Sequence, residues 1–359
     1  MRVLVPSPWS LRCGLLLLAF SAISAQTQLN AKSYINPTLP NVDAPDPGVL
    51  RWNQTTFLVA STGGDAHGVF PIRQSTDLTH WSHKPINYIF RDSTGPAWSI
   101  PGSPWAPELH TNGFDNGNVL AYYVSRHKNS KLLSIGAAVV ENATTTDPSD
   151  WIFQSVGKPL VHNVTGNMGS IDPSHFFDGA TSKHWLLYKS DGNAKKVPTV
   201  LFAQELTRDG TRSVGKAFAL LENNPTLWNE GNCIEAPWMI RHPHTNALIM
   251  FYSGPGYCPQ CGYSVSVARS DSGHILGPWK KYNQNPIMTQ NTSNFESPGH
   301  CSVVNGVNGG LAMVYHAYVK GREEDGRHLM LDELEWNDEG WVNTKHTCGQ
   351  PSETAQPIP

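Results

Sequence analysis

Phe57-Leu-Val-Ala-Ser61 is the first of five short apolar runs that recur in order along this chain of 359 residues. The others are Leu120-Ala-Tyr-Tyr-Val-Ser125, Trp185-Leu-Leu-Tyr-Lys-Ser190, Leu248-Ile-Met-Phe-Tyr-Ser253 and Leu311-Ala-Met-Val-Tyr-His316. The runs are rich in aromatic and aliphatic side chains, and clusters of Gly, Pro, Asn and Asp separate them, which is typical of β-strands. Helical periodicity is nearly absent, so we predict an all-β protein.

Each run begins 11 to 13 residues after an acidic or imidazole residue that has a proline or glycine within two positions. These five anchors recur at intervals of 62 to 65 residues and are Asp46, Glu108, Asp172, Glu235 and His300. A further strand-like run follows in every unit. A tryptophan then closes four of the five units, at Trp81, Trp151, Trp279 and Trp341. The third unit lacks this tryptophan.

Repeated β-units arranged radially form a β-propeller, and five repeats predict a five-bladed β-propeller. A β-sandwich with accidental spacing is the alternative, but it would not explain why anchor, aromatic run and tryptophan recur in one order. No linker interrupts residues 34–345, so we predict a single catalytic propeller domain over residues 26–345. Residues 346–359 form a C-terminal tail, and its Pro- and Ser-containing part from Gln350 is expected to be disordered.

The N-terminus has the features of a secretory signal peptide. Arg2 and Arg12 precede an apolar core, and small residues follow at Ser21-Ala-Ile-Ser-Ala25. The stretch from Cys13 to Ala25 holds 13 residues, whereas a helix that spans a membrane needs about 20. We therefore predict a signal peptide at residues 1–25 and a secreted, extracellular protein without a membrane anchor.

The remaining composition suits a neutral partner. Removal of Arg2 and Arg12 leaves 24 basic against 29 acidic residues, and no Lys/Arg cluster occurs. This argues against nucleic acid and against a membrane surface as partners. We expect a monomer that acts on a neutral polysaccharide or oligosaccharide. Four glycosylation sequons, at Asn53, Asn142, Asn163 and Asn291, fit an exported glycoprotein.

Five cysteines follow the predicted signal peptide: Cys233, Cys258, Cys261, Cys301 and Cys348. An odd number in an exported chain allows disulfides but leaves at least one thiol free or paired with another molecule. The Cys258-Pro-Gln-Cys261 motif has no second pair of this spacing, so we do not expect a zinc site. A local disulfide and two free thiols both remain open.

The five anchors are the candidate catalytic residues. In a propeller the first strand of each blade lines the central axis, so residues at equivalent positions of these strands converge. Crowded carboxylates raise one another's pKa, an arrangement that is costly unless it is used. Individually they are ambiguous, because Asp46 and Asp172 precede proline, a common turn signal, and Glu108 could be a structural charge. As a set they indicate hydrolysis of a glycosidic bond, which needs a proton donor and a base for water.

At these residues the sequence resembles glycoside hydrolase family 43, over about residues 35–345. The motifs that carry the resemblance are Ala-Pro-Asp46-Pro-Gly, Ser-Thr-Asp77-Leu-Thr-His-Trp81, Trp105-Ala-Pro-Glu108-Leu, Gly-Ser-Ile-Asp172-Pro-Ser, Ile-Glu235-Ala-Pro-Trp, Gly277-Pro-Trp279, Pro-Gly-His300 and Tyr315-His-Ala. Each motif alone is weak. Together they occur in order and at blade spacing.

The resemblance implies roles for four of these residues. Asp46 would be the general base that activates water, Glu235 the general acid, and Asp172 a third carboxylate that raises the pKa of the acid and orients it. Arg327 resembles an arginine that faces the substrate near the base, although it could also be an exposed charge after an acidic loop. Glu235 is followed by Ala-Pro where many members have Gly-Pro, which leaves the acid intact.

The resemblance also implies two further contacts with the substrate. His300 is similar to an axial histidine that sits beside bound calcium or ordered waters in many members. A neutral imidazole is a poor ligand for this cation, so a structural Ca²⁺ would be held mostly by water, and the chemistry needs no cofactor. Trp105 is a candidate platform for a sugar ring, and core packing is the alternative.

Together these residues predict an inverting hydrolase of α-L-arabinofuranosyl or β-D-xylosyl linkages in arabinan, arabinoxylan or xylan, with a bell-shaped pH–rate profile. A retaining furanosidase such as a fructan hydrolase would show Asn-Asp-Pro-Asn, Arg-Asp-Pro and Glu-Cys, where this chain has Pro-Asp-Pro, Ile-Asp-Pro and Glu-Ala. A non-catalytic sugar-binding propeller is the third hypothesis, and the intact set of carboxylates argues against it. The sequence does not reveal the linkage or the choice between endo and exo action.

Overall fold

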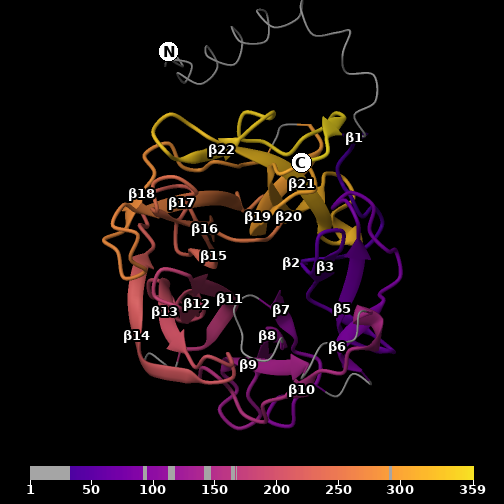
Figure 1. The fold of residues 1–359 in the computed structure, drawn as a ribbon, viewed down its shortest axis with the longest axis vertical. Coiled ribbons are helices and arrows are strands. Elements are labelled where there is room, and N and C mark those ends of the chain that lie inside the picture. Colours follow the sequence, from indigo (N-terminus) through magenta and orange to yellow (C-terminus); the bar gives the residue numbers. More distant parts are fainter. Residues whose placement is uncertain are drawn as a thin grey trace, which may run out of the picture.

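The computed structural model describes residues 33–91, 95–111, 118–140, 147–162, 166, 168–290 and 293–359. Five antiparallel sheets surround a central axis (Figure 1), which confirms the predicted five-bladed β-propeller. The predicted signal peptide and three sequons, at Asn142, Asn163 and Asn291, lie outside the described residues. Among the residues that are described, no helix is long and apolar enough to cross a membrane.

Each blade is built from consecutive strands. Blade one contains β2 (Gly48–Arg51), β3 (Phe57–Ala60), β4 (Gly64–Asp65), β5 (Gly68–Ser75) and β6 (Asn87–Arg91). Blade two contains β7 (Trp105–His110), β8 (Val119–Arg126), β9 (Leu133–Val140) and β10 (Gln154–Ser155). Blade three contains β11 (Ser170–Asp178), β12 (Lys183–Ser190), β13 (Val200–Leu206) and β14 (Ser213–Glu222).

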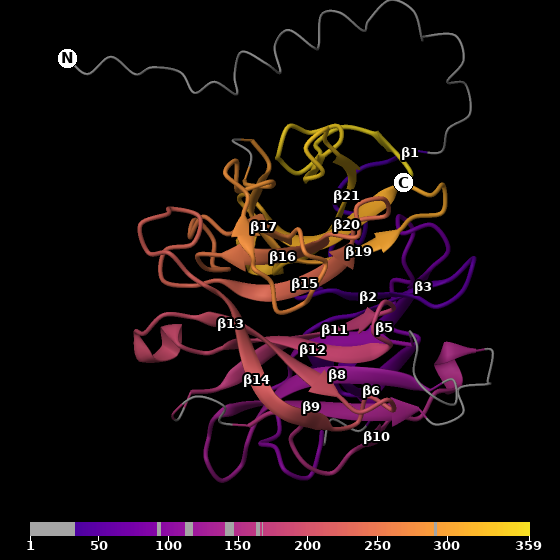
Figure 2. The same cartoon turned by 60° about the vertical axis from the view of Figure 1, so that its left-hand side comes forward.

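The C-terminal half forms the other two blades, which lie above blades two and three in Figure 2. Blade four contains β15 (Glu235–Arg241), β16 (Leu248–Gly254), β17 (Ser264–Ser270) and β18 (Lys280–Lys281). Blade five contains β19 (Phe295–Asn305), β20 (Leu311–Val319), β21 (His328–Trp336) and β22 (Val342–Thr344). Short 3-10 helices occur at Pro148–Asp150, Asn193–Lys195 and Glu323–Asp325.

The five apolar runs are the second strands of the blades, and both faces of each are buried between neighbouring sheets. In β12, Leu186 and Tyr188 pack in a cluster with side chains of blade two, whereas Trp185 and Leu187 pack in a cluster with side chains of blade four. Because alternate residues of a strand point to opposite faces, a strand between two blades is apolar on both. This explains why these runs are continuous rather than alternating.

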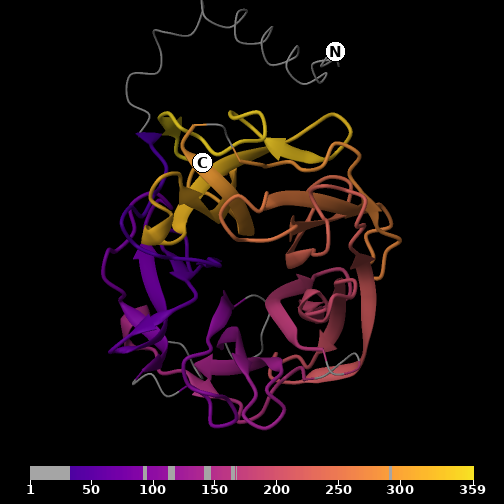
Figure 3. The same cartoon turned by 180° about the vertical axis from the view of Figure 1, so that it is seen from behind.

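The first residues that the structure describes lie beside the C-terminal end and close the ring, as the view from behind shows (Figure 3). β1 (Ser33–Tyr34) pairs with β23 (Gln356–Pro357), and the Ala44 amide donates to the Arg327 carbonyl of blade five at 2.8 Å. The predicted disorder of the tail after Gln350 is therefore wrong. Its composition is poor in apolar residues, but Ile358 is buried and β23 adds a paired strand.

The equivalent positions of the five blades differ from the anchors chosen in the sequence. In every blade the residue before a proline at the start of the inner strand has a positive φ of 45° to 54°. These residues are Asp46, Ala106, Asp172, Ala236 and Ser297. Glu235 therefore lies one residue before the equivalent position, Glu108 two residues after it and His300 three residues after it, so the predicted equivalence is wrong.

The physical reason is a register irregularity at this point of the inner strands. Pairing with the second strand shifts between Trp105 and Glu108, between Ile171 and Ser174, and between Glu235 and Trp238. A β-bulge places two residues opposite one and redirects side chains. Several consecutive residues can therefore face the same end of the axis, and function does not require one shared position.

Candidate active site

Asp46 stands before β2 and is held by blade five. Its Oδ1 lies 2.8 Å from Nη1 of Arg327, and its Oδ2 accepts a hydrogen bond from the Thr62 hydroxyl at 2.7 Å. Closure of the ring brings the two residues together, because the backbone amide of Arg327 also donates to the Asp43 carboxylate at 2.7 Å. Both oxygens of the Asp46 carboxylate thus have a fixed partner.

Two buried histidines complete the surroundings of Asp46. His300 Nδ1 lies 3.4 Å from Asp46 Oδ1, and the Asp46 backbone amide donates to His316 Nδ1 at 3.0 Å. Burial acts to raise the pKa of Asp46, but the charge of Arg327, together with the two histidines and the hydrogen bond from Thr62, outweighs it and holds this pKa well below its usual range. Asp46 is therefore ionised at any pH at which the protein would work.

Asp172 and Glu235 come from neighbouring blades and are linked through the backbone. Oδ2 of Asp172 accepts a hydrogen bond from the amide of Ala236, the residue after Glu235, at 3.0 Å. Burial raises the pKa of Asp172 to about 6, and the charges of Glu235 and Asp46 act in the same direction. Such a carboxyl group keeps its proton in mildly acidic solution.

The Glu235 carboxylate has an unexpected partner, Lys189, on the second strand of blade three. Oε2 of Glu235 accepts hydrogen bonds from Lys189 Nζ at 2.7 Å and from the Cys233 thiol at 3.2 Å. Burial acts to raise the pKa of Glu235, but the charge and hydrogen bond of Lys189 outweigh it and lower this pKa. The proton of the buried pair thus lies on Asp172, which differs from the predicted protonated Glu235.

Tyr263 shows that the three carboxylates meet. Burial raises the pKa of this tyrosine well above its usual value, and the negative charges of Glu235, Asp172 and Asp46 all raise it further. Gly299 packs against the ring of Tyr263 and must be glycine, because a Cβ at this position would lie 2.1 Å from Cε1 of the ring. The structure therefore gathers the three predicted catalytic residues around one buried ring, together with Arg327 and His300.

Two exposed aromatic side chains border this cluster. Trp105 begins β7 with 41% of its surface exposed, so it is not a core residue, and the amide of the next residue, Ala106, donates to Thr62 Oγ1 at 2.7 Å. Tyr257 is 53% exposed, and its ring centre lies 4.9 Å from Cζ of Arg327. Both rings therefore lie at the exposed border of the cluster around Asp46.

The loop that carries Tyr257 is held by a disulfide between Cys258 and Cys261, which settles the alternatives left open for that motif. The hydroxyl of Ser297 also donates to the carbonyl of Cys258 at 2.7 Å. Among the described residues Cys233 and Cys301 are free and buried, which confirms the expectation that at least one thiol has no disulfide partner.

Comparison with known proteins identifies the family. The model of "Glycosyl hydrolases family 43" matches residues 34–342. The chain belongs to glycosyl hydrolases family 43. Members of this family hydrolyse O-glycosyl compounds, so the chain is a glycosidase.

Known members of glycosyl hydrolases family 43 resemble the chain over most of its length. It is 22% identical to the extracellular endo-alpha-(1->5)-L-arabinanase 2 of Bacillus subtilis (strain 168), over 89% of this chain and 74% of that protein. A thermostable family-43 glycoside hydrolase of known structure is 24% identical, covers 91% of this chain and 99% of its own, and has a TM-score of 0.74. A xylan beta-1,4-xylosidase from Bacillus Halodurans C-125 is 21% identical with a TM-score of 0.66, and it matches 91% of this chain but 59% of its own.

Calcium remains a prediction for this family 43 protein. Among the described residues no group of three or more His, Cys, Asp or Glu side chains could hold a metal ion. His300 contributes one imidazole, whereas calcium prefers six to eight oxygen ligands. The side chains of the described residues alone therefore do not form a calcium site.

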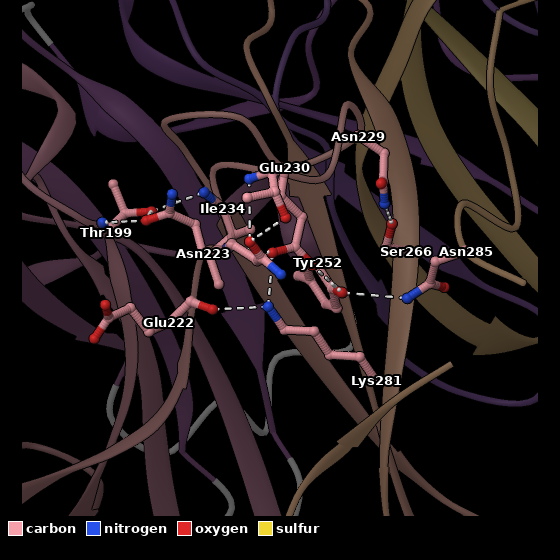
Figure 4. A network of polar contacts seen from close by, with 12 residues as sticks. Thr199, Glu222, Asn223, Asn229, Glu230, Ile234, Tyr252, Ser266, Lys281 and Asn285 are labelled. Carbon is pink, nitrogen blue, oxygen red and sulfur yellow. Dashed lines mark hydrogen bonds and ion pairs between the residues drawn. The ribbon is translucent and has the colours of Figure 1, made fainter. Parts of the chain in front are cut away.

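A buried polar network supports the loop that leads to Glu235 (Figure 4). The Glu230 carboxylate, which is fully buried, accepts hydrogen bonds from Tyr252 at 2.8 Å, from Lys281 at 2.6 Å and from the amide of Asn224 at 2.7 Å. Close to Glu235, the amide of Ile234 donates to the Thr199 hydroxyl at 2.7 Å. Buried networks with satisfied partners make a segment rigid, so Glu235 begins β15 from a fixed position.

Sequence reasoning missed Thr62, Lys189, Tyr257 and Tyr263. Thr62 and Tyr257 lie in loops between second and third strands, where no repeat marks them. Tyr263 reads as one more aromatic beside a strand. Lys189 gave the clearest signal that went unused, because it is a cation inside a run whose two faces are both buried.

The Thr62→Val variant is expected to lower kcat by about 10- to 100-fold, the range that corresponds to a hydrogen bond with a charged group. Valine keeps the size of threonine but cannot donate to Asp46 or accept from Ala106. The measurement is kcat on an aryl glycoside that the unchanged protein hydrolyses. Thr181→Val is the matched control, since Thr181 also donates to a carboxylate at 2.7 Å, that of Asp178 at the far end of blade three. An unchanged kcat in Thr62→Val would contradict the importance of this contact.

Proposed function

We propose that this glycosidase is a secreted, inverting enzyme that hydrolyses α-L-arabinofuranosyl or β-D-xylosyl linkages in arabinan, arabinoxylan or xylan. The observation that supports it most is the contrast between its carboxyl groups: Asp46 is ionised, while Asp172 and Glu235 share a buried site that retains a proton. The names of the relatives, an arabinanase and a xylosidase, favour these two sugars. The arabinanase is also extracellular, in agreement with the predicted signal peptide.

The proposed reaction uses one carboxyl group on each side of the glycosidic bond. Water attacks the anomeric carbon and gives a proton to Asp46, while the bond from that carbon to the leaving oxygen breaks. Asp172, which holds the proton of the pair in the free protein, passes it to Glu235, and Glu235 gives it to the leaving oxygen. One water is consumed, and afterwards Asp46 is protonated and the Asp172–Glu235 pair has lost its proton. Exchange of both with solvent restores the starting state.

The surroundings of Asp46 suit a base. Its two oxygens accept hydrogen bonds from Arg327 and Thr62, which fix the carboxylate. Each oxygen keeps a second lone pair, so it can still hold a water and take its proton. Arg327 would also bind sugar hydroxyls next to Tyr257, and Trp105 would offer a second apolar face to the sugar.

A substrate screen with product analysis tests the proposal. Aryl α-L-arabinofuranosides, aryl β-D-xylosides and linear arabinan would be incubated with the protein, and the first product would be followed by NMR. We expect hydrolysis of at least one of them, with a first product of opposite anomeric configuration. Retention of configuration would favour a retaining furanosidase instead, and binding of oligosaccharides without any release of product would favour a sugar-binding propeller.

The pH dependence of kcat/KM should show one limb in the accessible range rather than the bell expected from the sequence. As pH rises through about 6, the buried pair loses the proton that Asp172 holds, so the rate should fall. The second limb needs Asp46 to take up a proton, and because its pKa lies well below the usual range, this limb moves to strong acid. A steep loss of activity between pH 5 and pH 4 in a folded protein would contradict this account of Asp46.

A further inference from the structure

Lys189 is a buried cation at the catalytic cluster, and the proposed reaction assigns it no part. Its side chain is 1% exposed, and its Nζ lies 2.7 Å from Oε2 of Glu235. A buried ammonium is costly unless it is paired, and this ion pair joins the second strand of blade three to the inner strand of blade four. Although burial acts to lower it, the neighbouring Glu235 raises the pKa of Lys189 above its usual value, so the cation persists.

The equivalent position in blade four explains how Lys189 reaches Glu235. In blade three Lys189 pairs with Ile171, and in blade four Ser253 pairs with Glu235. Ile171 and Glu235 each stand directly before the residue of positive φ, so Lys189 and Ser253 occupy equivalent positions on their second strands. The Ser253 hydroxyl accepts a hydrogen bond from the amide of His300 in blade five at 2.9 Å. This position on the second strand therefore bridges to the next blade, and blade three places a charge where blade four places a hydroxyl.

The ion pair fixes which oxygen of Glu235 can serve a substrate. Oε2 is occupied by Lys189, which is almost fully buried, and by the thiol of Cys233, which is also buried. A carboxylate held by one oxygen against the interior directs its other oxygen away from these partners. The side chain of Glu235 is 11% exposed and that of Lys189 is 1% exposed, so Glu235 is the member of this ion pair that a substrate can touch.

We propose that Lys189 is a positioning residue that holds Oε2 of Glu235 and thereby presents Oε1 to the leaving oxygen of the substrate. The inference rests on the proposed role of Glu235 as proton donor. When Glu235 gives up its proton, negative charge develops on the carboxylate, and the fixed ammonium stabilises that charge in a site from which water is excluded. Lys189 therefore makes proton donation faster as well as better aimed.

The charged and titratable groups that face Glu235 decide in which direction the loss of Lys189 moves the pKa of the Asp172–Glu235 pair. They are Lys189 from β12, Asp172 from β11, Cys233 from the preceding loop and Tyr263 from the segment before β17. Of these only Lys189 is a cation. Without it, burial would favour the protonated form of Glu235. The pair would then lose its proton at a higher pH.

The Lys189→Met variant tests the proposal, because methionine keeps an unbranched chain but has no charge. We expect kcat on a substrate with a sugar leaving group to fall about 100-fold, within the range of general acid catalysis. KM should change little, and the alkaline limb of kcat/KM should move up by about one pH unit or more. Lys183→Met is the matched control on the same strand, since Lys183 also lies 2.7 Å from a carboxylate, that of Glu205, but is 47% exposed. It should change neither quantity.

Two further variants keep the test decisive. Lys189→Arg retains the cation and should leave the alkaline limb in place. Lys189→Gln keeps a hydrogen-bond donor without the charge, so it should shift the alkaline limb of kcat/KM as Lys189→Met does. It tests the role of the charge if Lys189→Met does not fold. An unshifted limb in the neutral variants, with wild-type kcat, would overturn the role of Lys189 alone. Failure of the unchanged protein to hydrolyse any tested glycoside would instead overturn the proposed function.

Discussion

The Glu235→Gln variant is expected to lose about 10⁴-fold in kcat on a substrate whose leaving group is another sugar. A sugar alkoxide is a poor leaving group, so bond cleavage depends on the proton that Glu235 donates. Glutamine has nearly the same shape as glutamate and can still accept a hydrogen bond from Lys189, but it has no acidic proton. The loss should therefore fall on kcat rather than on KM, and the measurement is the release of reducing ends from an oligosaccharide.

The nature of the leaving group provides the sharper part of this test. On an aryl glycoside with an acidic phenol, which leaves without a proton, Glu235→Gln should lose only about tenfold, because the step that needs acid catalysis is bypassed. Glu205→Gln is the control, since Glu205 pairs with Lys183 at 2.7 Å on the outside of blade three. It should behave like the unchanged protein on both substrates.

Asp172 is the rival proton donor, because it holds the proton in the free protein. The Asp172→Asn variant should lose activity on both kinds of substrate, because Asp172 orients the chain at Ala236. The loss should be larger on the sugar leaving group, which needs the proton that Asp172 stores. If dependence on the leaving group appeared in Asp172→Asn and not in Glu235→Gln, the two roles would have to be exchanged.

The fold could be predicted from the sequence because its strongest signal has a simple cause. Second strands such as β12 pack against a neighbouring sheet on each face, so both of their faces are apolar. The result is an uninterrupted apolar run such as Trp185–Tyr188, which does not depend on the loops. Five such runs in order allow few other folds. The tail was misjudged for the opposite reason: composition reveals little about Ile358, whose burial depends on a strand more than 300 residues away.

The membership of the site was predictable, but its geometry was not. Asp46 and Asp172 precede a proline directly, Glu235 precedes one by two residues, and the three recur at blade spacing, which the sequence shows directly. Their offset within each blade depends on a bulge at a residue of positive φ, and a count of residues cannot locate a bulge. Lys189 was missed because its partner lies in the next blade, a contact that spacing within one repeat does not reveal.

Replacement of Asp46 by asparagine should be the other severe change, with kcat lowered by about 10⁴-fold. Asparagine cannot take a proton from water. Arg327 and Thr62 each donate a hydrogen bond to one oxygen of the Asp46 carboxylate. The asparagine side chain has an NH₂ group in place of one of these oxygens, so it cannot accept both bonds in the same way. In contrast to the loss in Glu235→Gln, this loss should be equal for sugar and phenol leaving groups, because attack by water precedes or accompanies either departure.

The Asp43→Asn variant is the control for Asp46→Asn, since Asp43 accepts a hydrogen bond from the backbone amide of Arg327 at 2.7 Å but does not belong to the carboxylate cluster. It should retain activity to within about tenfold, the cost of one exposed hydrogen bond. A loss in Asp46→Asn that shrinks on acidic phenols would contradict the assignment, because only a group that supplies the proton for the leaving oxygen shows that pattern.

Acid stability supplies an independent check on the state of Asp46. Its pKa is depressed in the folded protein, so ionised Asp46 adds stability that is present above the pKa of an unfolded aspartate and is lost as pH falls toward the folded value. Asp46→Asn lacks this contribution at every pH. The difference in Tm between the unchanged protein and Asp46→Asn should therefore be largest near neutrality and narrow steadily below about pH 4, the ordinary aspartate pKa. A difference that stays constant between pH 7 and pH 2.5 would show that the Arg327 and histidine partners do not hold Asp46 in its ionised form, and the base would then have to be sought elsewhere in the cluster.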